Sequence, residues 1–328
     1  MTSKPSHEQS KVFVTGAAGF LGRALLERFS AAGWEVAGVD RAGDPASSVA
    51  AGDVLDPSGW TDRLAGADLV IHTAAVVSQV GDDDLFWNVN VLGTRRVLET
   101  AISHGVRRFV HISSCAAFGF DFPAEVDETH PVRTNGNPYV DTKVASEQVV
   151  LQAHAAGEIE CTVIRPTDIY GPGSRPWTII PVQMLRARQL LLPAMGAGVF
   201  SPVYIDNVVD GIRLAATSPA GSGQVFTLGD GITVSCKEYF GHYAKMLGGA
   251  PILALPTPAA VGIAATLGAA VRLTGRDSEA SSGAMRMLSR RNGYSIEKAR
   301  RLLNYEPAVS LEEGLRRTET WLRSERLI

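Results

Sequence analysis

The sequence predicts an α/β fold with a doubly wound parallel sheet, and three observations support this. Short apolar runs rich in β-branched residues alternate with segments of helical periodicity over residues 11–166. A glycine-rich turn joins the first run to the first helical segment, as in a strand–turn–helix unit. The chain has 328 residues, 45% of them hydrophobic and 20% charged, which suffices for one large domain or two unequal ones.

The first predicted unit spans residues 11–40. A β-branched run precedes the glycine turn, apolar residues then recur at helical spacing from Leu21 to Phe29, and a second apolar run ends at Asp40. The alternation continues with strands and helices in turn, at 68–75, 89–104, 108–114, 139–155 and 161–166. Strands separated by helix-length segments favour a parallel sheet that helices cover on both faces.

Three regularly spaced glycines, Gly16, Gly19 and Gly22, follow the first strand and open the first helix. Exposed backbone N–H groups and the helix dipole favour a pyrophosphate at such a turn, and positions without a Cβ let it approach closely. Phe20 and Leu21 complete the turn. We therefore expect a Rossmann-type dinucleotide site here; a glycine turn without a ligand is the alternative.

The end of the second strand indicates which dinucleotide binds. Asp40 lies at roughly the 20-residue distance where a carboxylate hydrogen-bonds the adenosine ribose and repels a 2′-phosphate. NAD is therefore favoured over NADP, although the adjacent Arg41 offers a cation to a 2′-phosphate. Asp53, which Val54 follows, is expected either to accept a hydrogen bond from the adenine amino group or to cap the next turn.

The regular alternation ends at about Gly171, where clusters of Pro and Gly replace it. We predict an NAD-binding Rossmann-type domain over 11–172, and a smaller, irregular C-terminal substrate-binding region over 173–198 and 231–328. Residues 199–216 have the pattern of a strand followed by a helix, so the segment 199–230 is expected to return to the main domain.

Composition excludes several classes of partner. The chain carries 31 Lys and Arg against 34 Asp and Glu, with a net charge of −3 and no basic stripe, so nucleic acid is not expected to bind. Cys115, Cys161 and Cys236 show neither a disulfide framework nor metal-ligand spacing, so we expect no metal site and a location in the reducing cytoplasm. Residues 1–11 are polar and do not resemble a signal peptide.

Residues 250–271 contain no charged residue over about the length of a membrane-spanning helix. The segment is rich in Ala, Gly and Pro rather than Leu and Ile, and Pro251, Pro256 and Pro258 interrupt its first third. We therefore expect a buried helix or one that covers a pocket; a membrane-associated flap is the alternative.

Three residues form a candidate catalytic group. Tyr139 and Lys143 lie four residues apart on a predicted helix, so both project from one face toward one substrate atom. A tyrosine with an ordinary pKa of about 10 is a poor base at pH 7 and needs nearby cations, which Lys143 and an oxidised nicotinamide would supply. Ser114 ends the strand 108–114 at the sheet edge where ligands bind, and its hydroxyl can hydrogen-bond the reacting oxygen.

The order of these motifs resembles the extended short-chain dehydrogenases/reductases, the NAD-dependent epimerase/dehydratase superfamily. The motifs are TGAAGFLG at 15–22, HTAA at 72–75, NVLGT at 90–94, SSCAAFG at 113–119, Tyr139-x-x-x-Lys143 and RPTDIYGPG at 165–173. The resemblance implies that Tyr139 is the general acid/base and that Ser114 orients the substrate oxygen. It also implies that Lys143 holds the nicotinamide ribose and lowers the pKa of Tyr139.

Further positions follow from the same resemblance. Ala74 and Ala75 would pass beside the cofactor, and Asn90 and Pro166 would complete its site, with Pro166 near the nicotinamide. Phe118 stands where the family often has Tyr, so a polar substrate contact is in doubt. The family also implies a homodimer built on the helices that carry residues 90–101 and 139–150.

Two positions favour an apolar substrate. Nucleotide-sugar members commonly carry an Asn for the substrate diphosphate where this chain has Asp168, and an Arg where it has Phe200. A carboxylate facing a pyrophosphate is unfavourable, so the anion-binding groups are expected to be absent. With its RPxxIYGPG and YxDNV patterns and its apolar segment 250–271, the chain instead resembles the 3β-hydroxysteroid dehydrogenase-like branch.

The leading hypothesis is reversible hydride transfer between NAD and a secondary alcohol or ketone of a bulky, hydrophobic, sterol-like small molecule. A nucleotide-sugar epimerase or dehydratase with bound NAD is the alternative, although residues 114–116 lack the acid/base pair typical of a dehydratase. A non-catalytic dinucleotide-binding sensor is a remote alternative, because it would be expected to lose the Tyr–Lys pair, which is present.

Overall fold

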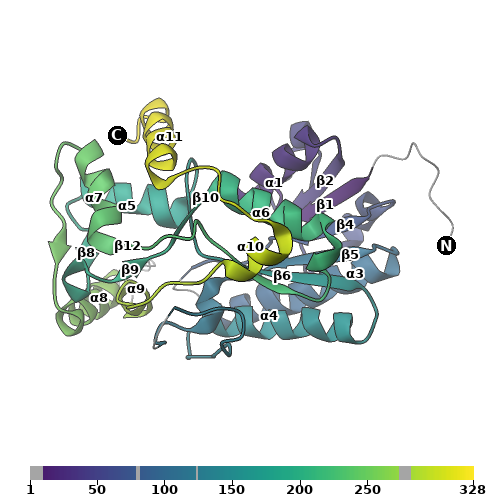
Figure 1. Cartoon of the computed structure of the whole chain (residues 1–328), viewed down its shortest axis with the longest axis horizontal. Helices are drawn as coiled ribbons and strands as arrows, with labels where there is room; N and C mark the ends of the chain where they lie inside the picture. The colour runs from purple at the N-terminus through teal and green to yellow at the C-terminus, as the bar shows by residue number, and fades with distance from the viewer. Residues whose placement is uncertain (1–9, 79–81, 123–124, 273–281) are drawn as a thin grey trace.

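The computed structural model describes residues 10–78, 82–122, 125–272 and 282–328. Its main feature is a seven-stranded sheet in the order β3-β2-β1-β4-β5-β6-β11, in which every neighbouring pair of strands is parallel. The strands are β1 (Lys11–Thr15), β2 (Glu35–Asp40), β3 (Val49–Ala51), β4 (Leu69–His72), β5 (Arg108–Ile112), β6 (Glu160–Pro166) and β11 (Val225–Leu228). The predicted doubly wound parallel sheet is therefore confirmed (Figure 1).

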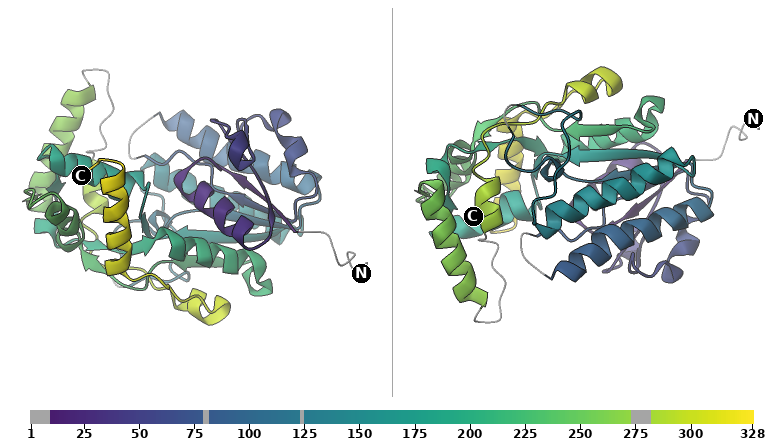
Figure 2. Two further views of the ribbon diagram at one scale, coloured as in Figure 1. Left: turned by 90° about the horizontal axis from the view of Figure 1, so that it is seen from above. Right: turned by 90° about the horizontal axis from the view of Figure 1, so that it is seen from below.

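Residues along each strand face two helical layers in alternation. Val12 and Val14 of β1 join a core with α1 (Phe20–Ala31) and α6 (Ile205–Thr217). Phe13 joins a second core with α3 (Thr94–Ser103) and α4 (Pro138–Ala155). Figure 2 shows α3 and α4 side by side in the view from below and α1 in the view from above. Both faces of the sheet are buried, which is why its strands have continuous apolar sequences.

The direction of winding reverses between β1 and β4. The chain passes from β1 outward to β3, and from β4 outward to β11 on the other side. In open parallel sheets, ligands bind beyond the carboxyl ends of the strands at such a switch point. The fold therefore brings the glycine turn after β1 and residues 73–78 after β4 to the expected ligand site.

The smaller elements lie mainly to one side of the sheet (Figure 1). Three two-stranded sheets pair β7 (Asp168–Tyr170) with β10 (Pro202–Tyr204), β9 (Val199–Phe200) with β12 (Val234–Ser235), and β8 (Leu191–Leu192) with β13 (Leu253–Ala254). The other α-helices described are α2 (Asp83–Phe86), α5 (Ile180–Arg186), α7 (Cys236–Met246), α8 (Thr257–Arg272), α9 (Ser282–Met287), α10 (Glu297–Leu303) and α11 (Leu311–Ser324). Short 3₁₀ helices occur at Pro45–Ser47, Pro57–Gly59, Thr61–Leu64, Cys115–Phe118, Ala194–Gly196 and Pro219–Gly221, and π-helical turns at Trp87–Gly93 and Arg175–Ile179.

The segment 199–230 divides between the two parts of the molecule. Its last strand, β11, joins the main sheet beside β6, and α6 packs against α1. Its first two strands, β9 and β10, pair within the small sheets instead.

Several boundaries differ from those that the sequence pattern predicts. β4 ends at His72 and β5 at Ile112, because the residues that follow leave the sheet for the ligand edge. The first part of the helix predicted over 89–104 is a π-helical turn, Trp87–Gly93. This turn follows α2 and leads without a break into α3. Residues 1–9, on which the expectation about a signal peptide rests, lie outside the described residues.

The apolar segment 250–271 contributes most of α8. Ala260 and Ala264 of this helix are buried against Leu191 and against Met285 of α9. No helix within the described ranges is long and apolar enough to cross a membrane.

Two histidines are buried side by side in the sheet. His72 of β4 and His111 of β5 stack with 5.7 Å between their ring centroids. Burial, and secondarily the charge of Lys143, lowers the pKa of His72 to about 3 and holds the pKa of His111 well below its usual value. Both rings are therefore neutral in the folded chain at neutral pH.

We expect the free energy of unfolding to fall as the pH drops below the ordinary histidine pKa of 6.5. The unfolded chain then binds protons that the folded chain does not, so each buried histidine removes about 1.4 kcal/mol of stability per pH unit, down to the folded pKa. Urea unfolding between pH 7 and 5 measures this slope. In the variant His111→Gln, the slope of the free energy of unfolding against pH should be smaller by the contribution of one histidine, whereas the exposed control His104→Gln should leave the slope unchanged. An unchanged slope in His111→Gln would contradict the assignment of His111 as a buried, neutral ring.

Candidate active site

The glycine turn after β1 is held by close contacts within the protein at two of its three positions. Gly16 has a φ of +69°, and a Cβ built there would lie 2.7 Å from the Thr73 Oγ1 atom. A Cβ at Gly22 would collide with the Gly16 carbonyl oxygen. These two glycines are required for the turn to pack against α1 and the segment after β4.

Gly19 differs, because the protein leaves space beside it. A Cβ at Gly19 would meet only the Gly16 carbonyl oxygen, at 3.0 Å, among the described residues. Gly19 is also the N-cap of α1, and no side chain hydrogen-bonds the N–H groups of this helix end. Phe20 and Leu21, the first two residues of α1, are half-buried beside the turn. An open, uncapped helix N-terminus fits a dinucleotide pyrophosphate.

Asp40 ends β2 directly beside this turn. Its Oδ2 atom accepts a hydrogen bond from the Ala18 N–H at 3.1 Å, which joins the strand end to the glycine turn. The Asp40 side chain is half-buried, whereas the adjacent Arg41 is exposed. The carboxylate is thus in position to bind a ribose hydroxyl.

Asp53 and Val54 lie on the loop after β3. The Oδ1 atom of Asp53 accepts from the Leu55 N–H at 2.8 Å, so the capping role is present, and the side chain is exposed. Val54 is buried and packs against the π-helical turn at Gly93. The Val54 side chain therefore belongs to the core behind the loop.

Asn90 holds the segment after β4 against α4. Its Oδ1 atom accepts from the Val76 N–H at 2.7 Å, and its Nδ2 atom donates to the Val76 carbonyl at 3.2 Å and to Thr142 Oγ1 at 3.1 Å. These contacts fix the half-buried Ala74 and Ala75 beside the glycine turn. The hydrogen bonds of Asn90 therefore hold the segment after β4 in place at the edge of the sheet where the cofactor is expected to bind.

Tyr139 and Ser114 meet at the carboxyl end of β5. Asn137 caps α4, with its Oδ1 atom accepting from the N–H groups of Tyr139 at 3.0 Å and Val140 at 3.2 Å, which places Tyr139 in the first turn. Ser114 caps the short 3₁₀ helix that follows β5. The Ser114 side chain lies near the Tyr139 hydroxyl and opposes the rise of its pKa, so one carbonyl oxygen can meet both groups.

Lys143 lies one turn further along α4, as the spacing predicts. Its Nζ atom donates to the Ile112 carbonyl at 2.8 Å and lies 6.0 Å from the centroid of the Tyr139 ring. Burial lowers the pKa of Lys143 to about 8, with the charge of Glu147 acting in the opposite direction. Burial raises the pKa of Tyr139 to about 12, and the Ser114 side chain opposes this shift. The phenol is therefore protonated at neutral pH.

A buried ion pair supports this group and is absent from the sequence predictions. Glu147 accepts from Arg165 Nε at 2.9 Å, from Arg165 Nη2 at 2.7 Å and from Ser113 Oγ at 2.5 Å. The Arg165 guanidinium also lies 4.5 Å from the centroid of the buried Phe118 ring. Glu147 and Arg165 are 18 residues apart in the sequence, on α4 and β6, so no local spacing reveals the pair.

The structure corrects the interpretation of Asp168 and Phe200. Asp168 is buried in an ion pair with Arg290 and accepts from the Ser201 N–H at 3.0 Å, so its charge is compensated and does not repel a ligand. Phe200 is fully buried and stacks on Tyr239 with 3.9 Å between centroids. Pro166 is likewise buried, at the end of β6 beside β11.

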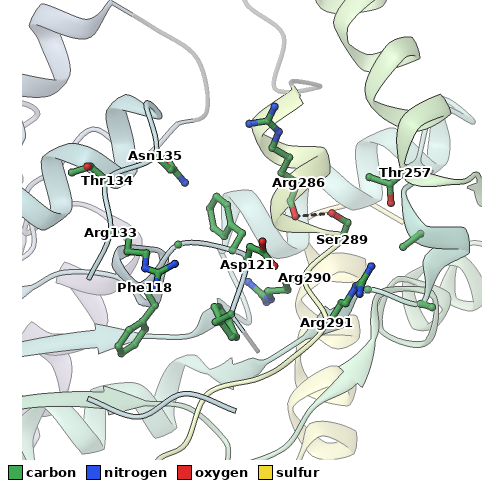
Figure 3. Close-up of a pocket in the computed structure, with 16 residues that line it drawn as sticks. Phe118, Asp121, Arg133, Thr134, Asn135, Thr257, Arg286, Ser289, Arg290 and Arg291 are labelled. Carbon is green, nitrogen blue, oxygen red and sulfur yellow. Dashed lines mark hydrogen bonds between the residues drawn. The ribbon is translucent and has the colours of Figure 1, made fainter. Parts of the chain in front are cut away.

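A pocket of about 870 Å³ lies between the loop after β5 and the smaller region (Figure 3). Its lining residues fall in segments 118–122, 133–135, 194–198 and 286–291, with Thr257 from α8. The expectation about anion-binding groups considered positions 168 and 200 alone, and the pocket lining adds Arg133, Arg286, Arg290 and Arg291.

Comparisons with known proteins show the family to which the chain belongs. The model of the NAD dependent epimerase/dehydratase family matches residues 12–229. A 2-alkyl-3-oxoalkanoate reductase of Stenotrophomonas maltophilia is 31% identical over 94% of this chain and 98% of its own length. A ketoreductase of Stigmatella aurantiaca that acts on a farnesylated quinoline oxide is 31% identical over 93% of this chain and 94% of its own length. A UDP-glucose 4-epimerase of Mycolicibacterium smegmatis is 30% identical over 96% of this chain and 99% of its own length.

Solved structures show the same fold. An epimerase of Methanothermobacter thermautotrophicus superposes with a TM-score of 0.81 at 25% identity, over 98% of this chain and 95% of that one. A dTDP-glucose 4,6-dehydratase of Streptomyces venezuelae, solved with NAD bound, superposes with a TM-score of 0.78 at 25% identity. The superposition covers 96% of this chain and 98% of that one. The chain therefore belongs to the NAD-dependent epimerase/dehydratase family and is an enzyme of the extended short-chain dehydrogenase/reductase type.

Proposed function

We propose that this enzyme transfers a hydride between NAD and a ketone or secondary alcohol on a bulky, hydrophobic substrate, of sterol-like or long-chain type. The observation that carries the proposal is the position of Ser114 after β5 and of Tyr139 in the first turn of α4, with the Lys143 Nζ atom 6.0 Å from the centroid of the Tyr139 ring. The half-buried Phe120 and the small side chains of Ala194 and Ala197 give the lining of the pocket an apolar part. The reductase and ketoreductase among the relatives act on substrates with large apolar parts, which supports the same class.

Tyr139 serves as the general acid in the reductive direction. Because its pKa is raised to about 12, the phenol carries a proton at neutral pH and can donate it to the carbonyl oxygen. Ser114 donates a second hydrogen bond to the same oxygen and so orients it. When bound, the nicotinamide supplies the hydride. In the oxidative direction, Tyr139 must first lose its proton, which the buried site makes unfavourable.

Lys143 has capacity to bind the cofactor ribose. An ammonium has three donors, and the Ile112 carbonyl takes one of them. The other two are available for ribose hydroxyls. The residues proposed to hold the rest of the dinucleotide are Gly16, Gly19, Phe20, Leu21, Gly22, Asp40, Arg41, Asp53, Val54, Ala74, Ala75, Asn90 and Pro166.

NAD is the proposed cofactor in preference to NADP, because Asp40 stands beside the glycine turn. The variant Asp40→Ala is expected to weaken NADH binding about tenfold, the effect of losing a hydrogen bond to a charged group, and to leave NADPH binding unchanged or stronger. Fluorescence titration with the two nucleotides measures both affinities. The exposed control Asp62→Ala should change neither, and an equal loss for both nucleotides in Asp40→Ala would refute the ribose contact.

A nucleotide-sugar epimerase or dehydratase remains the second candidate, because arginines line the pocket and relatives include enzymes of both kinds. The two functions differ in the fate of the hydride. With NADH carrying deuterium at C4, a reductase places one deuterium on the product carbinol carbon. An epimerase returns the hydride within one turnover and leaves the substrate unlabelled. We expect the labelled alcohol.

Two further predictions from the sequence stay proposals. The family resemblance favours a homodimer built on the helices that carry residues 90–101 and 139–150. A cytoplasmic location agrees with Cys115, Cys161 and Cys236 being buried free thiols.

A further inference from the structure

Arg290 differs from the other arginines of the pocket lining because it is buried (Figure 3). Arg133, Arg286 and Arg291 are exposed. The Arg290 side chain is 2% exposed and forms an ion pair with the carboxylate of Asp168, which is 4% exposed. Arg290 is among the described residues that line the pocket, and Asp168 is not. The pocket therefore borders on the cation of this pair and not on its anion.

Two contacts hold Arg290 in place independently of Asp168. Its Nε atom donates to the Val199 carbonyl at 2.9 Å, and its own carbonyl accepts from the Val199 N–H at 2.8 Å. Its Nη2 atom donates to the Oδ2 atom of Asp168, and its Nη1 atom has no hydrogen-bond partner among the described residues. Loss of the Asp168 charge alone would thus leave the guanidinium at the pocket wall without a counter-charge.

The ion pair lies beside the segment that carries Ser114. Cys115, the next residue, is buried in one cluster with Tyr294. The Arg290 guanidinium lies 5.5 Å from the centroid of the Tyr294 ring. Burial raises the pKa of Cys115 to about 12, and the nearby charges of Asp168 and Arg290 act on this pKa in opposite directions. The pair is therefore close in space to the end of β5, where the proposed reaction takes place.

The pairing determines what this part of the pocket can bind. A planar guanidinium matches the oxygens of a phosphate, and a buried one without a counter-charge favours any anion that can reach it. With Asp168 in place, the charge is already compensated inside the protein. A ligand phosphate at this position would lose hydration and gain no free counter-charge in return, whereas an apolar or neutral ligand loses nothing comparable.

We propose that Asp168 is a specificity-determining residue: by pairing with Arg290 it masks a phosphate site in the pocket wall and so disfavours substrates that carry a diphosphate, such as UDP-glucose. The anion-binding group is thus present but occupied by the protein's own carboxylate. The inference rests on the proposed function in taking the pocket as the substrate side of the enzyme. It gives a physical reason for a hydrophobic substrate in preference to a nucleotide sugar.

Calorimetric titration with UDP-glucose in the presence of NAD tests the masking. Asp168→Asn should bind UDP-glucose about tenfold more tightly than the wild type, as expected for one hydrogen bond between charged groups. The double variant Asp168→Asn/Arg290→Gln should lose this gain and match the wild type. The control Asp121→Asn removes the same charge from an exposed residue of the lining, and it should strengthen binding by at most about threefold.

Three results would overturn the proposal. The first is no gain in Asp168→Asn, and the second is a gain that persists when Arg290 is also replaced. The third is weaker binding by the double variant than by the wild type, which would mean that Arg290 already binds the diphosphate. This third comparison involves no unpaired buried charge, so it does not depend on whether Asp168→Asn folds.

The stability of Asp168→Asn gives a second readout, because this variant contains an unpaired buried cation. Pyrophosphate should raise its urea midpoint, or restore its folding transition, and should do so more than for the wild type. An equal effect on both proteins would contradict the masked site. NADH consumption with a hydrophobic ketone is read separately: its absence beside a gain in UDP-glucose binding would contradict the proposed function and leave the masking intact.

Discussion

The variant Tyr139→Phe is expected to lower kcat for ketone reduction about a thousandfold, because general acid catalysis contributes on the order of 10²–10⁴ to such reactions. The phenol is the proposed proton donor to the carbonyl oxygen, and its pKa is raised to about 12 by burial. Removing one hydroxyl from the first turn of α4 leaves the ring and the helix cap intact. NADH affinity should therefore change less than twofold. Steady-state kinetics with a bulky ketone and a separate NADH titration measure the two effects.

A matched control is Tyr170→Phe. Tyr170 is buried, and its hydroxyl makes a long bond of 3.4 Å to the Leu311 carbonyl. This variant should retain kcat. If Tyr139→Phe kept more than half of the wild-type turnover, Tyr139 would not be the proton donor.

The second large effect is expected at the buried Glu147–Arg165 pair. The side chains are 0% and 6% exposed, so removing the carboxylate leaves a buried guanidinium without its counter-charge. Breaking a buried pair in this way costs about 3–5 kcal/mol of stability. We therefore expect Glu147→Gln to lower the free energy of unfolding by about 3 kcal/mol, measured by urea titration. The double variant Glu147→Gln/Arg165→Met, which also removes the cation, should recover part of the loss.

Glu147→Gln also tests whether the pair positions the catalytic group electrostatically. The charge of Glu147 raises the pKa of Lys143, and burial lowers that pKa to about 8. Without the carboxylate, the pKa of Lys143 should fall further. The decline in activity above pH 8, where Lys143 loses its charge, should then begin at a lower pH. A stability loss below 1 kcal/mol together with an unchanged pH profile would contradict both roles.

The sequence predicts those features whose partners are close along the chain. The glycine turn, Asp40 at the end of the second strand and the Tyr139–Lys143 spacing each depend on one local unit, and the structure brings all of them to one edge of the sheet. Strand alternation likewise suffices for the parallel sheet, because both of its faces are buried.

The remaining features depend on partners far apart in sequence. Asp168 is compensated by Arg290, 122 residues away, so no local pattern distinguishes this carboxylate from one that faces a ligand. The amide of Asn90 bonds to Thr142, 52 residues away. The pocket arginines come from segments that approach each other only after the smaller region folds. Hence the residues at the edge of the sheet where the cofactor is proposed to bind can be predicted from the sequence better than the residues that would contact the substrate.

The central claim is net hydride transfer from NADH to a bulky ketone, and absorbance at 340 nm tests it most directly. The enzyme would be mixed with NADH and a panel divided between hydrophobic ketones and nucleotide sugars. We predict that NADH is consumed in a one-to-one ratio with reduction of a ketone in the first group. A flat trace with every ketone, together with conversion of a nucleotide sugar at constant NADH, would contradict the claim and identify an epimerase or dehydratase.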